Sequence, residues 1–218
     1  MEFKEYMHYT IPPFIMAICP EIASILIQTV ENNNKTGKKT VIALSAGSAL
    51  VGIFRSLIKR QQEKKLDLTQ VIFFQINEFF PMEFMDIHSY SKFLYDNFFC
   101  HLDIPEQNLH YIHANQSEVQ MRKFCQEYEK SIQSLDGPDI SIVDVGRNGS
   151  VGFNEPGSLA STRTRLVHLD QITRGDSASD FFGQENVPYM GITMGMSTLM
   201  RSKKLFILGV GDHKALIM

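Results

Sequence analysis

The fold class is decided by the stretch Thr40-Val41-Ile42-Ala43-Leu44-Ser45-Ala46-Gly47-Ser48. It begins with a short β-branched and apolar run, which is typical of a buried strand, and passes at once into small residues that favour a turn. Apolar residues then recur at helical spacing from Leu50 to Ile58. A buried strand followed directly by a turn and a helix is the repeating unit of parallel α/β sheets.

The same alternation of helix and strand extends along the chain in both directions. We predict a first helix from Pro20, because proline is favoured in the first helical turn, up to the run Asn32-Asn33-Asn34. A long helix is predicted from Ser117, because Ser117 and Gln120 have the spacing of a capping box. The remaining predicted elements are a strand at Val71–Phe74, a helix around Tyr90–Phe99, and strands at Ile140–Val145, Thr164–Leu169, Gly191–Met194 and Leu205–Val210.

This order of elements predicts an α/β fold with a three-layer, doubly wound and mostly parallel sheet of the Rossmann-like type. In such folds ligands lie beyond the carboxyl ends of the strands. With 218 residues and 44% hydrophobic content the chain can bury a sizeable core, and we expect residues 1–218 to form a single domain.

Charge and cysteine content exclude several classes of partner. A formal net charge of −3, without long runs of like charge, gives no electrostatic reason to expect nucleic acid or a membrane as a partner. Cys19, Cys100 and Cys125 show no Cys-x-x-Cys spacing, which argues against a disulfide framework or a metal site and favours the reducing cytoplasm. The apolar stretch Ile11–Ile27 is interrupted by prolines, so we read it as a loop leading into a helix and not as a membrane span or a signal sequence.

The end of the chain allows two interpretations. Asp212 is a typical helix-capping residue, but the chain ends at Met218. So few residues cannot form a stable helix alone. Either the sequence is part of a longer protein or this end docks on another surface.

Three loops follow predicted strands, namely Ser45–Ser48, Asn77–Pro81 and Gly146–Pro156. We expect them to lie together, because the carboxyl ends of parallel strands share one edge of the sheet. Gly47, between small residues at the start of a helix, offers backbone N–H groups and serine hydroxyls to a phosphate, although plain turn chemistry explains the same residues. Glu155, fixed next to a proline, is a candidate catalytic carboxylate or a solvated loop residue.

Four segments stand in a specific order along the chain. They are Asn97-Phe98-Phe99 with Leu102-Asp103-Ile104-Pro105, Phe153-Asn154-Glu155-Pro156, Thr162-Arg163-Thr164-Arg165 and Lys214-Ala215-Leu216. Together they resemble the glucosamine-6-phosphate deaminase and isomerase family, over most of the chain from about Thr40. Phosphogluconolactonases share this fold but lack the Asn-Glu-Pro segment, so Glu155 favours the deaminase side.

The resemblance implies a usually oligomeric enzyme that opens the ring of an amino-sugar phosphate, moves a proton between C2 and C1, and releases ammonia without a cofactor or a metal. It implies a sugar phosphate as the small-molecule partner and a homo-oligomer as the assembly. By the same resemblance, we expect the sequence to stop short of the family's C-terminal strand and helix. Carried over by position, Ala46, Gly47, Ser48 and Lys214 would hold the phosphate, Asn77 would stand in the place of the proton-shuttling carboxylate, and Asn148, Ser150 and Glu155 would stand where the family opens the ring.

Departures from the family pattern concern the groups that handle protons. The family has Asp-Glu where this chain has Asn77-Glu78, and Asp-Gly-His where it has Asn148-Gly149-Ser150. Amides do not accept a proton near neutral pH, and the loss of one positioned general base typically costs about 10²–10⁴-fold in rate. The chain resembles most a deaminase-like branch, known from longer fused proteins, in which the usual Asp and His are also replaced.

Glu78 and Arg147 are further candidate site residues, and each allows two interpretations. Glu78 is a substitute base or a structural carboxylate, and the second is favoured because neighbouring side chains of a strand point to opposite faces. Arg147 is either a phosphate ligand or part of a surface salt bridge. It would compensate for the family's arginine on the phosphate, whose place is taken by Asp180 or Ser179 in this chain. We interpret the histidines as surface or packing residues: His8, His88, His101, His110, His113, His168 and His213.

Two functional hypotheses follow. The first is an amino-sugar phosphate isomerase or deaminase with altered or weakened chemistry. The second is a non-catalytic protein that kept the scaffold for sugar-phosphate binding or for subunit interaction.

Overall fold

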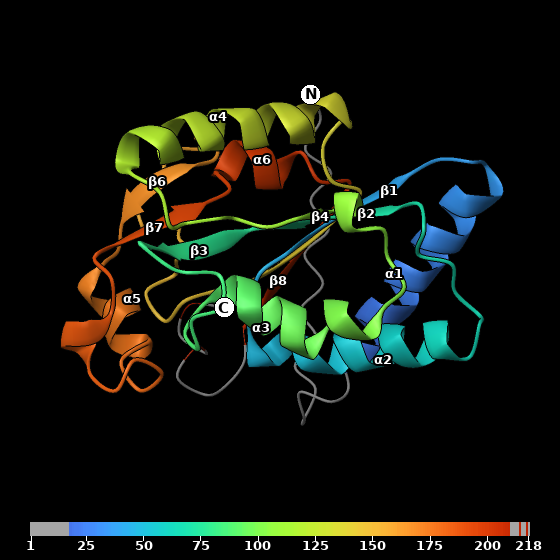
Figure 1. Cartoon of the computed structure of the whole chain (residues 1–218), viewed down its shortest axis with the longest axis horizontal. Helices are drawn as coiled ribbons and strands as arrows, with labels where there is room; N and C mark the ends of the chain where they lie inside the picture. The colour runs from blue at the N-terminus through green and yellow to red at the C-terminus, as the bar shows by residue number, and fades with distance from the viewer. Residues whose placement is uncertain (1–17, 210–213, 215–216, 218) are drawn as a thin grey trace.

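The computed structural model describes residues 18–209, 214 and 217 (Figure 1). The helices are α1 (Ile18–Lys35), α2 (Val51–Gln62), α3 (Tyr90–Asn97), α4 (Glu118–Ser134), α5 (Gln171–Asp176) and α6 (Met196–Met200). The strands are β1 (Thr40–Leu44), β2 (Val71–Gln75), β3 (Asn77–Phe80), β4 (Leu109–His110), β5 (Ile140–Asp144), β6 (Arg165–His168), β7 (Met190–Thr193) and β8 (Lys204–Leu208). The predicted loop before Pro20 and the predicted cap at Asp212 lie outside the described residues.

A five-stranded parallel sheet forms the centre of the molecule, with strand order β4-β2-β1-β5-β8. Within this sheet, β1 is the first strand along the chain, and β2 and β4 are added outward from it on one side. The chain then returns and adds β5 and β8 on the other side of β1. The strand order therefore reverses between β1 and β5. In parallel α/β sheets this reversal opens a crevice at the carboxyl ends of the two strands.

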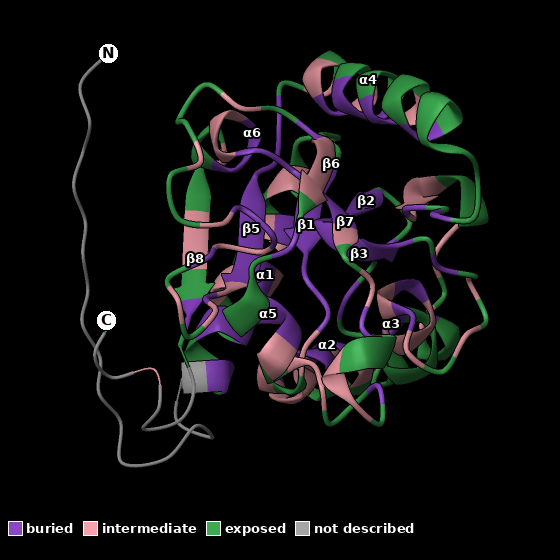
Figure 2. Ribbon diagram, turned by 90° about the vertical axis from the view of Figure 1, so that its left-hand side faces the viewer, coloured by how far each residue is buried: buried purple, intermediate pink, exposed green. Residues whose placement is uncertain are grey.

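Alternate residues of the strands pack into two cores, one on each face of this sheet. Ile42 and Leu44 face a core that includes residues of α1, α2 and α3, whereas Val41 and Ala43 face a core that includes residues of α4 and of a second, smaller sheet. The ribbon shows the helices α1 and α2 on one side of the sheet and α4 with α6 on the other (Figure 1). The inner strands β1, β2 and β5 are almost entirely buried, whereas the edge strand β8 is largely exposed or half-buried (Figure 2). The predicted three-layer α/β fold is confirmed.

Part of the predicted strand arrangement is wrong. The strands at Arg165–His168 and Met190–Thr193 do not join the parallel sheet but form a separate antiparallel sheet with β3, in the order β3-β7-β6. Residues Asn77–Phe80, which we interpreted as a loop, are the edge strand of this sheet. Asn77–Phe80 is fully buried, and a buried backbone needs partners that a loop would not supply. β7, which is distant in sequence, provides them.

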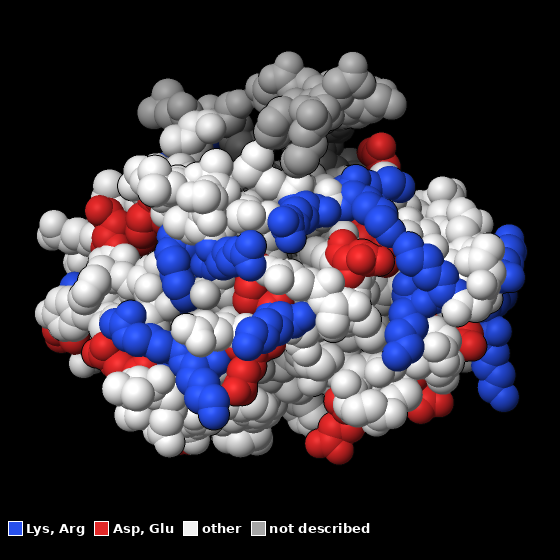
Figure 3. Space-filling view, turned by 90° about the horizontal axis from the view of Figure 1, so that it is seen from above, with Lys and Arg blue, Asp and Glu red and all other residues white. Residues whose placement is uncertain are grey.

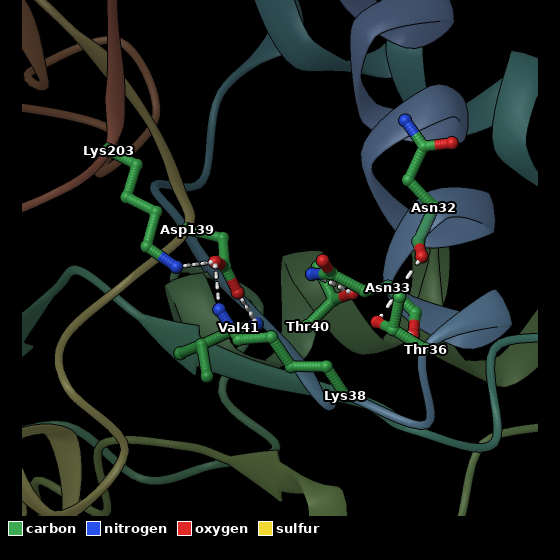
Figure 4. Close-up of polar contacts among 8 residues, drawn as sticks. All are labelled: Asn32, Asn33, Thr36, Lys38, Thr40, Val41, Asp139 and Lys203. Carbon is green, nitrogen blue, oxygen red and sulfur yellow. Dashed lines mark hydrogen bonds and ion pairs between the residues drawn. The ribbon is translucent and has the colours of Figure 1, made fainter.

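The first helix continues beyond the predicted stop at Asn32-Asn33-Asn34 and ends at Lys35. Asparagine usually interrupts a helix by bonding its own backbone. Here Asn33 instead donates its side-chain amide to Thr40 Oγ1 at 2.9 Å, and Asn34 donates to the carbonyl oxygen of Asp67 at 2.8 Å. The helix is therefore tied to the following strand instead of being broken (Figure 4). The predicted capping box of Ser117 and Gln120 on α4 is present.

Asp139 fixes the opposite end of the sheet from the crevice. Its carboxylate accepts a hydrogen bond from the backbone of Val41 at 2.9 Å and pairs with Lys203 Nζ at 2.5 Å, with Lys38 Nζ at 3.5 Å (Figure 4). Asp139 donates its own backbone N–H to the carbonyl oxygen of Val41. These bonds set the register at which β5 begins beside β1.

The surface above α4 carries both signs of charge. Lys and Arg side chains are interspersed with Asp and Glu on this face (Figure 3). No helix in the described part of the chain is long and apolar enough to cross a membrane.

Candidate functional site

A cavity of about 710 Å³ lies where the sheet opens between β1 and β5. Its lining comes from segments that are distant in sequence. The loop after β1, the start of β3, the loop after β5, the start of α3 and Lys214 all contribute. The three loops that the sequence placed at strand ends therefore converge, although the second of them is a strand.

The residues expected at the phosphate line one part of this cavity. Ala46, Gly47, Ser48 and Lys214 all face it. A 3₁₀ turn at Ser48–Leu50 runs directly into α2, and the N-cap residue Gly47 supplies no side-chain cap. The first N–H groups of this turn are thus free of a capping side chain, which is the arrangement in which a helix start can bind an anion.

The loop after β5 folds tightly above the sheet. Gly146 donates its N–H to the carbonyl oxygen of Ser150 at 2.7 Å, and Gly149 and Gly152 adopt positive φ angles of 87° and 58°. These φ angles strongly favour glycine. Gly146 also needs its hydrogen atom, because a Cβ atom there would lie 2.3 Å from Ser150 Oγ. This tightly folded loop places the buried side chain of Ser150 at the cavity wall.

Glu155 lies behind this wall in a closed network of hydrogen bonds. Its carboxylate accepts from Asn148 Nδ2 at 2.8 Å, from Thr173 Oγ1 at 3.0 Å and from the backbone N–H of Asp170 at 2.9 Å. Asn148 in turn accepts from the N–H of Ser150 at 3.0 Å. Thr173 and Ser150 line the cavity, whereas Asn148 and Glu155 do not. Asn148 thus acts as a donor to Glu155 on one side and as an acceptor on the other.

Asn77 and Glu78 point in different directions, as expected for neighbours on a strand. Asn77 lines the cavity, and its side-chain oxygen is buried without a hydrogen-bond partner among the described residues. Glu78 accepts hydrogen bonds from the N–H groups of Phe79, Tyr90 and Ser91 and is buried away from the cavity. Burial raises the pKa of its carboxyl above the usual range. The geometry agrees with the structural interpretation of Glu78, since its carboxylate bonds the start of α3.

Arg147 is engaged in an ion pair. Its guanidinium lies 2.8 Å from Asp176 Oδ1, with half of the arginine side chain exposed. Asp176 and Asp180 both line the cavity, whereas Arg147 does not. The arginine therefore neutralises one of the acidic groups at this wall.

Asp144 is a lining residue that sequence reasoning missed. It ends β5, and its Oδ1 accepts a hydrogen bond from Ser45 Oγ, which follows β1, at 3.1 Å. Burial raises the pKa of the Asp144 carboxyl, although the positive charge of Lys214 and the Ser45 hydrogen bond act against this. A signal was present in the sequence, since Asp144 is the one charged residue in the mostly apolar run Ile140–Val145.

Tyr90 and His88 also line the cavity. Burial and the nearby charge of Asp144 raise the pKa of the Tyr90 hydroxyl. His88, which we predict to be a surface or packing residue, is part of the cavity wall. Its Nδ1 lies 2.7 Å from Asp86 Oδ1 and its ring stacks on Phe181. In the described part of the chain, no group of three or more metal-binding side chains is gathered in one place.

Known proteins resemble this chain in sequence over most of its length. The family described as glucosamine-6-phosphate isomerases/6-phosphogluconolactonase matches residues 16–218. A glucosamine-6-phosphate deaminase-like protein of Bacteroides thetaiotaomicron is 34% identical over 194 residues, which are 89% of this chain but only 29% of that protein. A glucosamine-6-phosphate deaminase of Clostridioides difficile is 32% identical over 81% of this chain and 70% of its own length.

Solved structures of related proteins have a similar fold. A structure described as a monomeric glucosamine-6-phosphate deaminase superposes with a TM-score of 0.86 at 29% identity, covering 93% of this chain and 82% of the other. The 6-phosphogluconolactonase of Trypanosoma brucei superposes with a TM-score of 0.76 at 14% identity, over 95% of this chain and 83% of the other, which shows a shared fold. By its sequence and by its fold, the chain belongs to the glucosamine-6-phosphate isomerase/6-phosphogluconolactonase family.

Proposed function

We propose that this chain binds a sugar phosphate in the cavity between β1 and β5 and acts on amino-sugar phosphates with weakened isomerase and deaminase chemistry. One observation carries the proposal. The candidate phosphate residues Ala46–Ser48 and Lys214 line the same cavity as Asn77 and Ser150, although these residues come from four separate segments. The relatives described as glucosamine-6-phosphate deaminases support the choice of substrate class.

The site offers distinct groups to the two ends of such a ligand. The N–H groups at the start of the turn before α2, which no capping side chain occupies, and the ammonium group of Lys214 suit a phosphate. Asn77, Ser150 and Tyr90 offer amide and hydroxyl groups to the hydroxyls of a sugar. The volume of about 710 Å³ is large enough for a small ligand of this kind.

Proton transfer is the weak part of the site. The reaction needs groups that open the ring and move a proton from C2 to C1, and Asn77, Asn148 and Ser150 cannot supply a base near neutral pH. Glu155 keeps its carboxylate, but three donors occupy it and it does not reach the cavity. We therefore expect turnover of glucosamine 6-phosphate to be slower by about 10²–10⁴-fold for each missing base.

A specific observation also favours the second hypothesis, a protein that binds a sugar phosphate without turning it over. Asn148 and Glu155 satisfy one another within a closed network that requires an amide at position 148. A network of this kind stabilises the loop whether or not any chemistry takes place. The expected homo-oligomer stays a prediction.

Ammonia release from glucosamine 6-phosphate separates the two hypotheses. Measurable native turnover that Glu155→Gln abolishes would establish a working enzyme. Absence of native turnover, with some activity gained by the double change Asn77→Asp and Ser150→His, would establish a binding protein that lost its proton relay.

Ligand binding is tested separately by thermal shift with hexose and hexosamine phosphates, since a ligand of the folded state raises the melting temperature. Lys214→Ala should abolish the shift. Lys123→Ala, which removes an exposed lysine on α4, should leave it unchanged. Absence of a shift with every sugar phosphate would contradict both hypotheses.

A further inference from the structure

The phosphate end of the cavity contains a carboxylate next to the groups that should bind an anion. Asp144 lines the cavity together with Gly47, Ser48 and Lys214. Its Oδ1 accepts a hydrogen bond from Ser45, the residue directly before the candidate phosphate loop Ala46–Ser48, at 3.1 Å. An ionised carboxylate at this place repels a phosphate dianion and competes with it for the lysine.

The position of Asp144 is fixed by the sheet and not by a mobile loop. Asp144 pairs with Leu208 of β8 in the parallel register, and its backbone N–H contacts Ser45 Oγ at 3.2 Å. Ser45 is fully buried and its own N–H bonds the carbonyl oxygen of Ile142. The carboxylate therefore cannot withdraw from the crevice without disturbing the junction of β1 and β5.

Besides Asp144, the charged residues in the described part of the chain that line the cavity are Asp176, Asp180 and Lys214, and His88 and Tyr90 are further titratable groups. Ser45 approaches the Asp144 carboxylate from the β1 side and Leu208 from β8, and neither carries a charge. The α3 side contributes the hydroxyl of Tyr90, and the segment after β8 contributes the ammonium of Lys214. Of the described residues that face it, Lys214 alone carries a positive charge, and it is the cation that the ligand needs. Asp176, at the same cavity, is already paired with Arg147.

We propose that Asp144 controls the affinity of the cavity for a phosphate by coupling phosphate binding to its own protonation. This inference rests on the proposed function, because it assumes that a sugar phosphate occupies the cavity. When Asp144 is ionised it attracts Lys214 and opposes the phosphate. When it takes up a proton, the lysine becomes available to the ligand and the repulsion disappears. The raised pKa of this carboxyl places the protonated form within closer reach of neutral pH.

The test measures binding of glucose 6-phosphate and of glucose 6-sulfate by titration calorimetry between pH 5 and pH 9. The sulfate ester keeps a constant charge over this range, so any pH dependence of its binding comes from the protein. Native protein should lose up to about tenfold in affinity for the sulfate as the pH rises through the pKa of Asp144. Asp144→Asn should bind both ligands about tenfold more tightly at pH 8 and should show a clearly weaker pH dependence with the sulfate.

Asp103→Asn is the matched control. It removes one negative charge from an exposed position outside the cavity, so it should behave as the native protein does. Ser45→Ala is a second variant for the case in which Asp144→Asn does not fold. Without the serine hydrogen bond the Asp144 pKa rises further, and the loss of affinity should move to higher pH.

Equal or weaker binding by Asp144→Asn at pH 8, or a flat pH profile of the native protein with the sulfate, would overturn the inference and leave the proposed function standing. An unchanged profile in Ser45→Ala would do the same. If neither the native protein nor Asp144→Asn binds either ligand at any pH, the proposed function itself fails, and the inference falls with it.

Discussion

The substitution Asn148→Asp restores the residue type that the family pattern has at this position, and the structure predicts that it is costly. Asn148 Nδ2 lies 2.8 Å from Glu155 Oε2. With an aspartate at 148, two carboxylate oxygens would meet at this contact. Unit charges about 4 Å apart repel by about 4 kcal/mol at an effective dielectric constant of about 20, and a charge-assisted hydrogen bond worth about 1.5–3 kcal/mol is also lost.

Both side chains are half-buried, so relaxation and solvent reduce this sum, and we expect a loss of about 2–4 kcal/mol in the free energy of unfolding at pH 8. The sign of the pH dependence follows from the repulsion. Like charges raise one carboxyl pKa in the folded state, so the cost grows as pH rises from the unfolded value of about 4 and is complete above the raised pKa. At pH 4.5 the repulsive part should stay below about 1 kcal/mol.

Urea unfolding at pH 4.5 and pH 8 measures both quantities. The chain supplies a matched control in Asn115→Asp, because Asn115 Nδ2 donates to Glu83 Oε2 at 3.1 Å in an exposed position. There the same change should cost less than about 1 kcal/mol at either pH. If Asn148→Asp loses no more stability at pH 8 than Asn115→Asp does, the network around Glu155 is not closed in the way described.

Three further predictions concern stability. Burial raises the pKa of Glu129, but hydrogen bonds from threonine side chains outweigh this effect and lower the pKa overall. Glu129→Gln should therefore lower the free energy of unfolding by about 1–3 kcal/mol at pH 7, and by less as the pH falls through the lowered pKa. An equal loss at pH 3 and pH 7 in urea unfolding would contradict this. Asp139→Ala should lower the free energy of unfolding by about 2–3 kcal/mol in the same assay, because the N–H of Val41 loses a charged acceptor at 2.9 Å. A loss below about 0.5 kcal/mol, which is typical of a surface substitution, would refute this prediction. In Gly195→Ala a Cβ atom would lie 2.2 Å from a backbone carbonyl oxygen. This overpacking should cost roughly 1–3 kcal/mol and lower the melting temperature by several degrees. Gly175→Ala is the control and should leave the melting temperature unchanged, because its Cβ atom would meet no atom nearer than 3.9 Å.

The central sheet could be predicted because its signal is local. The run Thr40–Leu44 consists of β-branched and apolar residues without alternation, as expected for a strand buried on both faces, and all of its residues are buried. The capping box at Ser117 and Gln120 is likewise complete within one helical turn.

The second sheet could not be predicted because its pairing is not local. The residues of β3 follow β2 after a single residue, and Asn77-Glu78-Phe79-Phe80 shows neither helical nor alternating hydrophobicity. Its partner β7 lies more than 100 residues further along the chain, with Asn77 opposite Thr193. Only the tertiary fold brings these strands together, and it also turns Asn77 into the cavity.

The candidate site was predictable in its location but not in its charge. Three loops converge because parallel strands end at one edge of the sheet, which the order of elements already implied. The contact between Asp144 and Ser45 joins residues 99 positions apart and has no signature in the sequence. The ion pair of Arg147 with Asp176 is equally non-local, so the sequence left open whether this arginine was available to a phosphate.

The amide at position 148 and the carboxylate at position 144 have opposite consequences for any attempt to rebuild the proton relay. Asn148 is a donor that Glu155 requires, so a carboxylate there is driven to take up a proton and cannot serve as a base. Asp144 already supplies a carboxylate to the cavity, but at the proposed phosphate end, within the electrostatic reach of Lys214. A relay therefore cannot be recovered by restoring one residue. Asn77→Asp and Ser150→His have the better prospect, because both positions line the cavity and neither provides a donor to Glu155.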